Sequence, residues 1–159
     1  MSKDEMIRRV AIGLRLLQQS FDAFDEAAAT ALRLNRTDLR ALDLLLYGGG
    51  PLSAGELSAA LKLSPAATTT VIDRLERAGL AGRAQDPHNR RRILVAPTDA
   101  ARTVEQDLYV PVGVAGAQAL AGYTVDQLAT ILDFLHVARQ VQDDQAIRVS
   151  TTRDHPDRA

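Results

Sequence analysis

The sequence predicts a mainly α-helical chain with one short β-hairpin. Apolar residues recur three and four positions apart along most of the chain, a spacing that is typical of amphipathic helices. The exception lies at residues 80–96, where two short runs flank an Asp-Pro-His-Asn turn and the second run contains Ile93, Leu94 and Val95. Aromatic residues make up only 4% of the chain, so the core must be built from leucine, alanine, valine and isoleucine.

The first predicted helix covers about residues 4–31. Its apolar side chains are Ile7, Val10, Ala11, Leu14, Leu17, Phe21, Phe24 and Ala28. A single compact domain of this size does not need a lone helix of about seven or eight turns. We therefore expect the apolar stripe of this helix to be buried against a second copy of the chain.

The second predicted helix begins at Asn35–Thr37 and ends at the run Gly48-Gly49-Gly50-Pro51. Its apolar side consists of Leu39, Leu42, Leu45 and Leu46. The glycine run is not followed by a lysine and a serine or threonine. It is therefore interpreted as a linker and not as a phosphate-binding loop.

Two short helices come next. Ser53 and Glu56 have the spacing of a capping box, which opens a helix that reaches about Leu61. After a tight turn, Ser64 caps a second helix that runs to Ala78, with a proline in its first position. Glycine at the next position ends this helix.

The predicted hairpin follows, with strands at Leu80–Ala84 and Arg92–Ala96. Two short helices joined by a tight turn and followed by a hairpin form a winged helix-turn-helix. In this fold the second helix fits the major groove of DNA, which is about 12 Å wide, and the hairpin, or wing, lies along the flanking backbone.

The C-terminal third is predicted to be helical. Thr98 caps an alanine-rich helix that Pro111 should kink or break. Thr124 and Gln127 form another capping box, which opens a last helix. The apolar stripe of that helix is Leu128, Ile131, Leu132 and Leu135.

These elements predict four regions. Residues 1–34 and 98–142 are expected to contribute to dimerisation, and residues 35–97 to form the DNA-binding domain. Residues 143–159 are polar and lack apolar periodicity, so a disordered tail is expected there.

Charge is distributed unevenly along the chain. The net charge is −1, yet residues 71–95 contain six arginines and three acids. A local basic surface on a mildly acidic protein is typical of a polyanion site. A solvated charged surface is the alternative, and on charge alone the two interpretations are equally supported.

Helical spacing separates the two sides of the second short helix. Thr68, Val71, Ile72 and Leu75 should pack inward. Small residues on the other side allow close approach to base edges, the free amides at Ser64 can bind a phosphate, and Arg74 can reach phosphate or guanine. The candidate DNA-binding residues are Ser64, Ala66, Ala67, Thr69, Thr70 and Arg74 on the helix, with His88, Asn89, Arg90 and Arg91 on the wing. Arg92, at the start of a strand, is expected to pair with an acid of the body.

The segment LSPAATTTVIDRLERAGLAGRAQDPHNRRRILVAPTDAAR resembles the recognition helix and wing of the MarR (multiple antibiotic resistance regulator) family, and the order of helices resembles that family over most of the chain. The family's wing carries an Asp-x-Arg pattern that ends in Leu-Thr. Arg91 and Thr98 match this pattern, whereas Asn89 replaces the acid that usually orients the wing arginine and Pro97 replaces the leucine.

The resemblance implies an obligate homodimer that binds a near-palindromic operator in double-stranded DNA as a transcriptional regulator, most often a repressor. It also implies a small-molecule effector, because members often bind aromatic acids or drugs between the dimer helices and the winged core. The alternative is a ligand-binding dimer with residual DNA affinity whose partner is a protein. The intact helix pair and wing argue against that alternative.

Other function classes lack support. The chain has no cysteine, its three histidines lack metal-ligand spacing, and no nucleophile and base stand together, so we expect no metal, no cofactor and no enzymatic activity. No apolar run has the length of a membrane span and the N-terminus is not a signal peptide, so a cytoplasmic location is expected.

Overall fold

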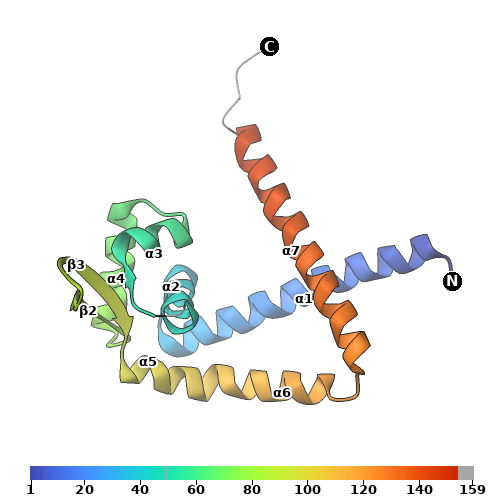
Figure 1. Ribbon diagram of the computed structural model, residues 1–159, viewed down its shortest axis with the longest axis horizontal. Coiled ribbons are helices and arrows are strands. Elements are labelled where there is room, and N and C mark those ends of the chain that lie inside the picture. Colours follow the sequence, from blue (N-terminus) through green and yellow to red (C-terminus); the bar gives the residue numbers. More distant parts are fainter. Residues whose placement is uncertain (49, 154–159) are drawn as a thin grey trace, which may run out of the picture. The chain divides into compact units, whose positions relative to one another are not determined.

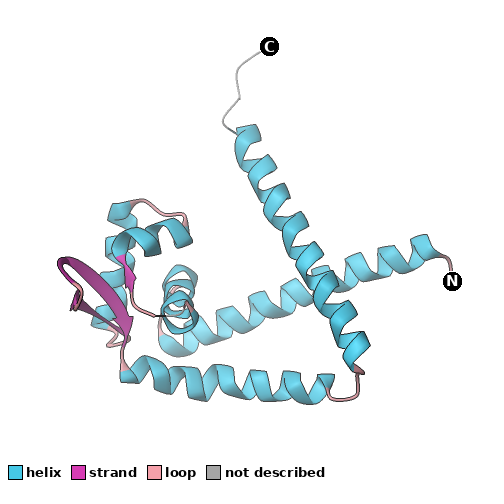
Figure 2. Ribbon diagram, in the orientation of Figure 1, coloured by secondary structure: helices cyan, strands magenta, loops and turns pink. Residues whose placement is uncertain are grey.

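A computed structural model describes residues 1–48 and 50–153. Helices dominate it, and the strands form a small sheet (Figure 2). The elements are α1 (Lys3–Leu32), α2 (Arg36–Tyr47), β1 (Leu52–Ser53), α3 (Ala54–Leu61), α4 (Pro65–Arg77), β2 (Ala81–Asp86), β3 (Asn89–Pro97), α5 (Asp99–Val104), the π-helix η1 (Glu105–Tyr109), α6 (Val110–Leu120) and α7 (Val125–Arg153) (Figure 1). The predicted fold class, mainly helical with a small wing, is confirmed. The chain divides into two compact units, residues 1–111 and a second unit that begins at Val112.

The predicted helix starts are confirmed at their capping residues. Asn35, Ser53, Ser64 and Thr98 each accept a hydrogen bond from a backbone N–H in the first turn of the following helix. At the start of α7, the Thr124 N–H donates to the Gln127 side chain and the Gln127 N–H donates to the Thr124 hydroxyl. Such reciprocal bonds satisfy backbone donors that have no partner inside the helix.

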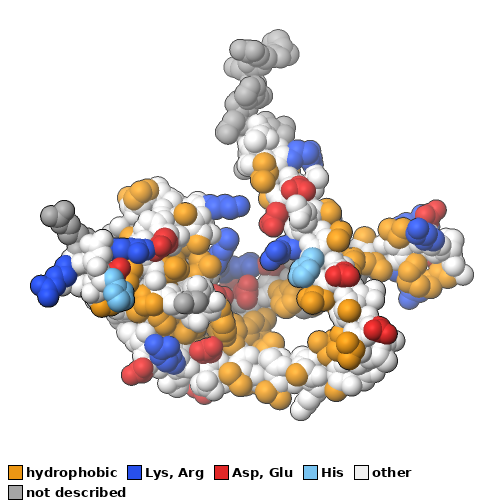
Figure 3. Space-filling view, viewed as in Figure 1, with side chains coloured by type: hydrophobic (Ala, Val, Ile, Leu, Met, Phe, Trp, Pro, Cys, Tyr) orange, Lys and Arg blue, Asp and Glu red, His pale blue; other side chains and the backbone are white. Residues whose placement is uncertain are grey.

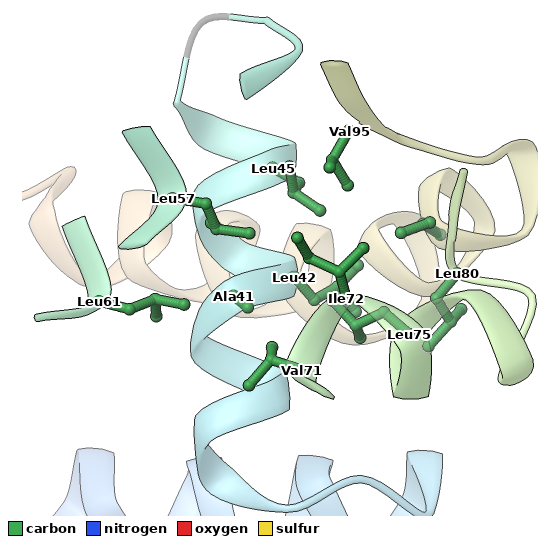
Figure 4. Packing of buried hydrophobic residues seen from close by; sticks show 12 residues of the cluster. Ala41, Leu42, Leu45, Leu57, Leu61, Val71, Ile72, Leu75, Leu80 and Val95 are labelled. Atoms are coloured by element: carbon green, nitrogen blue, oxygen red, sulfur yellow. The ribbon is translucent and has the colours of Figure 1, made fainter. Parts of the chain in front are cut away.

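The core of the first unit lies where α2, α3 and α4 meet under β3. Leu42 and Leu45 of α2, Leu57 of α3, Leu75 of α4 and Val95 of β3 are all buried and point toward one another (Figure 4). The inward side of α4 is the one that helical spacing predicts: Thr68, Val71, Ile72 and Leu75 are buried. The opposite side of α4 is exposed to solvent.

Pro111 does not break the helix. The helix changes locally from α to π just before the proline. The chain stays helical through α5, η1 and α6, and the five residues before Val110 form a π-helical turn in which the Val110 N–H bonds to Glu105 O. Pro111 has no N–H for the carbonyl one turn earlier, and its ring crowds that carbonyl. A wider π turn just before the proline accommodates both effects without ending the helix.

The expectation of a disordered tail from residue 143 is wrong for residues 143–153. Helix α7 continues without interruption to Arg153. An existing helix extends at little cost because only its first turn is unfavourable to form. Residues 154–159 of the predicted tail lie outside the described residues.

The sheet has the strand order β1-β3-β2, and both pairings are antiparallel. The two-residue strand β1 is too short for a sequence pattern, and β2 and β3 are longer than predicted. Gln85 lies opposite Ile93, but Asp86 lies opposite Asn89. Residues 90–92 therefore form an irregularity in β3, with no cross-strand partners on β2. This bulge contains the whole arginine triplet.

Candidate nucleic-acid interface

The outward side of α4 carries small side chains. Ser64, Ala66, Thr69 and Thr70 are exposed and Ala67 is half-buried. The hydroxyls of Thr69 and Thr70 donate to the carbonyls of Pro65 and Ala66 at 3.0 and 3.1 Å. Because each hydroxyl already donates its hydrogen to a carbonyl of the helix, it can present only an acceptor oxygen and a methyl group to a base edge. This favours contact with an amino group or with a thymine methyl.

Arg74 requires a correction, because it is not held out toward a ligand on this side of α4. Its Nε and Nη2 atoms donate to the two carboxylate oxygens of Asp38 in α2 at 2.8 and 2.6 Å. Asp38 is only 2% exposed, and these hydrogen bonds raise the pKa of the Arg74 guanidinium. Helical spacing places the Cβ of a residue but not the end of a long side chain, which here turns back to a buried anion. Sequence reasoning missed Asp38, whose partner lies 36 residues away.

Two further arginines of the predicted basic surface are also paired. Arg83 of β2 bonds to Asp73 at 2.7 Å and to Glu76, both in α4. Arg92 bonds to Glu56 at 2.6 Å and lies 3.7 Å from Asp86, which confirms the expectation that it pairs with an acid of the body. Among the described side chains of the basic segment, Arg90 on the wing and Arg77 at the end of α4 therefore have no acidic partner, and Arg77 bonds only to a backbone carbonyl.

The wing tip, residues 87–91, consists of a tight turn at residues 87 and 88 and the first residues of β3. The carboxylate of Asp86 accepts a hydrogen bond from the His88 N–H at 2.8 Å, an arrangement that replaces a backbone turn bond. His88, Asn89 and Arg90 are exposed. Arg90 forms no ion pair with a described residue, and basic side chains lie at the outer end of the wing (Figure 3). The backbone of Arg91 is part of β3, and its side chain lies outside the description.

A cavity of about 410 Å³ opens between α1, α2 and the end of α3. Its charged lining residues are Asp25, Arg36, Arg40 and Asp43. Arg36, the first residue of α2, also reaches Asp22 of α1 at 2.5 Å. The cavity thus offers both cationic and anionic groups to a ligand.

One side of this region holds polar atoms that are buried without a partner. The Oδ1 atom of Asp43 and the Oη atom of Tyr109 are inaccessible to solvent and make no hydrogen bond of normal geometry to a described residue, although the two groups lie close enough to shift each other's pKa. The Tyr109 ring packs edge-on against Phe24 and Tyr47, with centroid distances of 5.8 and 6.0 Å. Burial, together with the nearby charge of Asp43, raises the pKa of the Tyr109 hydroxyl. Unsatisfied buried polar atoms carry a free-energy cost, which a ligand could relieve.

Replacing Asp43 with asparagine should stabilise the protein at neutral pH. Burial raises the pKa of the Asp43 carboxyl, so the folded state binds its proton more tightly than the unfolded state does. Stability then falls as pH rises through the ordinary carboxyl pKa, about 4, and stays lower above the raised value. We expect Asp43→Asn to have a higher Tm than the parent at pH 7 and no advantage below about pH 4.

Thermal melting at both pH values measures this effect. Asp133→Asn, which removes an exposed carboxylate from α7, is the control and should leave Tm nearly unchanged. An Asp43→Asn protein that melts no higher than the parent at pH 7 would contradict the role assigned to burial.

Comparison with known proteins gives a consistent assignment. The model of the MarR family matches residues 34–93, which contain α2, the helix pair and most of the wing. The HTH-type transcriptional regulator YcgE of Bacillus subtilis is 33% identical over 148 residues, covering 93% of this chain and 96% of that protein. The regulator YkoM of the same organism is 27% identical over 138 residues, covering 85% and 89%.

Solved structures agree on the fold. A MarR family protein from Bacillus stearothermophilus superposes with a TM-score of 0.62 at 20% identity, covering 92% of this chain and 99% of that one. The MepR Q18P mutant from Staphylococcus aureus gives 0.66 at 12% identity, covering 84% and 96%. None of the helices in the described part of the chain is long and apolar enough to cross a membrane. The full-length similarity to YcgE, together with the family match over the winged core, shows that this chain belongs to the MarR family of DNA-binding transcriptional regulators and is not an enzyme.

Proposed function

We propose that this protein is a homodimeric repressor that binds a near-palindromic operator and responds to a small-molecule effector. The observation that carries the proposal is the division of α4 into two sides. One side is buried in the core, and the other presents small, exposed residues beside a basic wing tip. This is the arrangement in which a recognition helix lies in the major groove and a wing contacts the flanking DNA.

The proposed contacts divide into positioning and base recognition. The free amides at the start of α4, next to Ser64, bind a phosphate. Ala66 and Ala67 allow the helix to approach the bases, and Thr69 and Thr70 contact base edges. On the wing, His88 and Asn89 flank the contact, Arg90 binds a phosphate, and Arg91 enters the minor groove, where narrow A·T-rich DNA concentrates negative potential.

Dimerisation is supported by apolar side chains that the single chain leaves exposed. On the apolar stripe of α1 these include Ile7, Leu17 and Phe21, which are 56%, 46% and 59% exposed. On α7, Leu132 and Leu135 are 54% and 45% exposed. Continuous apolar surface of this kind is unfavourable in water and is typical of an interface. A two-fold dimer would place two recognition helices on two half-sites, which explains the near-palindromic operator.

The effector is proposed to enter the cavity between α1 and α2. Arg36 and Arg40 would face a carboxylate of the ligand, and Asp43 would accept a hydrogen bond from a donor. Phe24, Tyr47 and Tyr109 supply aromatic surface nearby. This chemistry fits an aromatic acid. Such a ligand would act on the operator complex by favouring one arrangement of α1 relative to α2.

Two alanine variants, Thr70→Ala and Arg90→Ala, should change DNA binding in different ways. Thr70→Ala removes a base contact, so it should alter preference at one or two operator positions by about 1–3 kcal/mol. Arg90→Ala removes a phosphate contact, so it should weaken binding to all sequences alike and lower the salt slope by about one per half-site. Gel shifts on the DNA that flanks the gene, repeated over a range of salt concentrations and sequence variants, measure both effects.

The control for these two variants is Thr103→Ala, which removes an exposed hydroxyl from α5. It should bind like the parent. If all three variants bind every sequence like the parent at every salt concentration, the wing tip and α4 are ordinary solvated surfaces. The base and phosphate contacts assigned to Thr70 and Arg90 would then be wrong.

A further inference from the structure

The arginine triplet of the wing lies in a stretch of β3 that is not paired with β2. Residues 90–92 of β3 have no cross-strand partners on β2, because the register shifts between Gln85 and Asp86. The part of β3 that follows the bulge is paired on both sides, because Leu94 and Val95 have partners on β1 and on β2. A bulge loses ladder hydrogen bonds, so other contacts must select one conformation for it.

Arg92 supplies such a contact at the end of the bulge. Its Nη2 atom lies 2.6 Å from Glu56 Oε1, and its Nη1 atom lies 3.7 Å from Asp86 Oδ2. Asp86 is the residue that closes the turn at the wing tip through its bond to the His88 N–H. The guanidinium therefore connects the start of α3, the end of β2 and the bulge itself.

The position of the Glu56 side chain is fixed by hydrogen bonds that do not involve Arg92. Its Oε2 atom accepts hydrogen bonds from the Ser53 N–H and the Ser53 hydroxyl, both at 2.7 Å, in the capping box of α3. Ser53 in turn belongs to β1 and pairs with Leu94. These bonds and Arg92 lower the pKa of the Glu56 carboxyl to about 2, so it is charged throughout the physiological range.

This pair differs from an ordinary surface ion pair. Exposed pairs contribute little because two flexible side chains must be ordered to form them. Here the carboxylate is already ordered by the cap, and only Arg92 loses freedom. Because Glu56 is tied to β1 and β1 is paired with β3, the contact closes a small ring of interactions around the base of the wing.

We propose that Arg92 is a positioning residue for DNA recognition, which clamps the bulge to Glu56 so that the backbone of residues 90–92 meets DNA in one conformation. The inference rests on the proposed function, in which the wing tip contacts the operator. Arg92 does not touch DNA in this scheme. Its effect passes through the backbone of residues 90–92.

Glu56→Gln is the decisive variant. Glutamine retains the capping box, so α3 keeps its start, but it removes the charge that holds Arg92. It also removes one negative charge from the DNA-binding domain, which by electrostatics alone would tighten binding to DNA. The clamp predicts the opposite: operator affinity should fall by about fivefold or more, with the preference for A·T flanks reduced. Arg92→Gln should show the same loss, and the double variant should be no weaker than either single variant.

Asp99→Asn is the matched control, since it removes an exposed acid at the start of α5 whose ion pair is with Arg102. Hydrogen exchange of the backbone amides of residues 88–93 is measured in the DNA-free protein. It should become faster in Glu56→Gln and stay unchanged in Asp99→Asn. Thermal melting confirms that the core is intact in each variant.

The outcomes separate this inference from the proposed function. If amide exchange at the wing is unchanged in Glu56→Gln, the clamp does not exist and the inference is overturned, whatever the DNA results. If exchange becomes faster but Glu56→Gln binds the operator as well as the parent, Arg92 orders the wing without positioning it for DNA, which also overturns the inference. If the parent binds no operator, the proposed function fails, and if Arg90→Ala binds like the parent, the proposed role of the wing tip fails.

Discussion

Arg74→Met should lower the free energy of unfolding by about 3 kcal/mol, because it leaves the buried carboxylate of Asp38 without its cation. Asp38 is 2% exposed and receives two hydrogen bonds from Arg74. Removing one partner of a buried pair costs about 3–5 kcal/mol, and the lower end applies here because a third of the Arg74 side chain is exposed to solvent. For a chain of this length the loss corresponds to a Tm lower by about 6–12 °C.

Calorimetry of three variants measures this effect. The double variant Arg74→Met with Asp38→Asn should recover much of the lost stability, since it removes the stranded charge as well. Arg77→Met is the control, because its guanidinium bonds to a backbone carbonyl on the exposed side of α4. Well below its Tm, Arg74→Met should keep the salt slope of the parent on operator DNA. A reduced slope with unchanged Tm would instead place Arg74 on a phosphate.

Leu17→Glu combined with Phe21→Glu should convert the dimer into monomers and lower operator affinity by about 10²–10⁴-fold. These two residues of α1 are 46% and 59% exposed in the single chain. Two charges on this stripe would have to be buried in the dimer without partners. The affinity loss follows because the second half-site would no longer be bound at the high effective concentration that a linked partner gives.

Analytical ultracentrifugation at micromolar concentration measures the assembly, and a gel shift measures binding. The parent should sediment as a dimer with twice the chain mass of 17.2 kDa. Gln19→Glu places the same charge on the opposite side of α1 and should remain dimeric with full affinity. A double variant that is monomeric and still binds the operator like the parent would refute the dimer as the DNA-binding species.

The helices and their starts could be predicted from the sequence because their determinants are local. The start of α3 follows from Ser53 and Glu56, which lie three residues apart, and the buried side of α4 follows from the spacing of Val71, Ile72 and Leu75. The extent of α7 could not be predicted in this way. Helix extension depends on propensity and on an existing helix, and neither produces an apolar stripe.

The candidate site was only partly predictable. Whether an arginine is free to bind DNA depends on whether an acidic residue lies beside it in the fold, and that acid can be far away in the sequence. Arg74, Arg83 and Arg92 look like Arg90 in the sequence, and all four lie in the same basic segment. Their partners differ: Arg74 and Arg92 bond to acids 36 residues away, while Arg90 has no described ion-pair partner. The bulge at residues 90–92 is likewise a result of sheet register, which alternation of side chains along a strand does not reveal.

The first turn of α2 takes part in two ion pairs, supplying the cation of one and the anion of the other. Arg36 is held by Asp22 of α1, and two residues later Asp38 holds Arg74 of α4. Because both pairs start from one turn, a shift of α1 that moved this turn would alter the geometry of both pairs. In that case α1 and α4 would be thermodynamically linked, and the linkage would be reciprocal. Operator binding at α4 would alter affinity for anything that binds against α1 by the same factor that the ligand alters affinity for the operator.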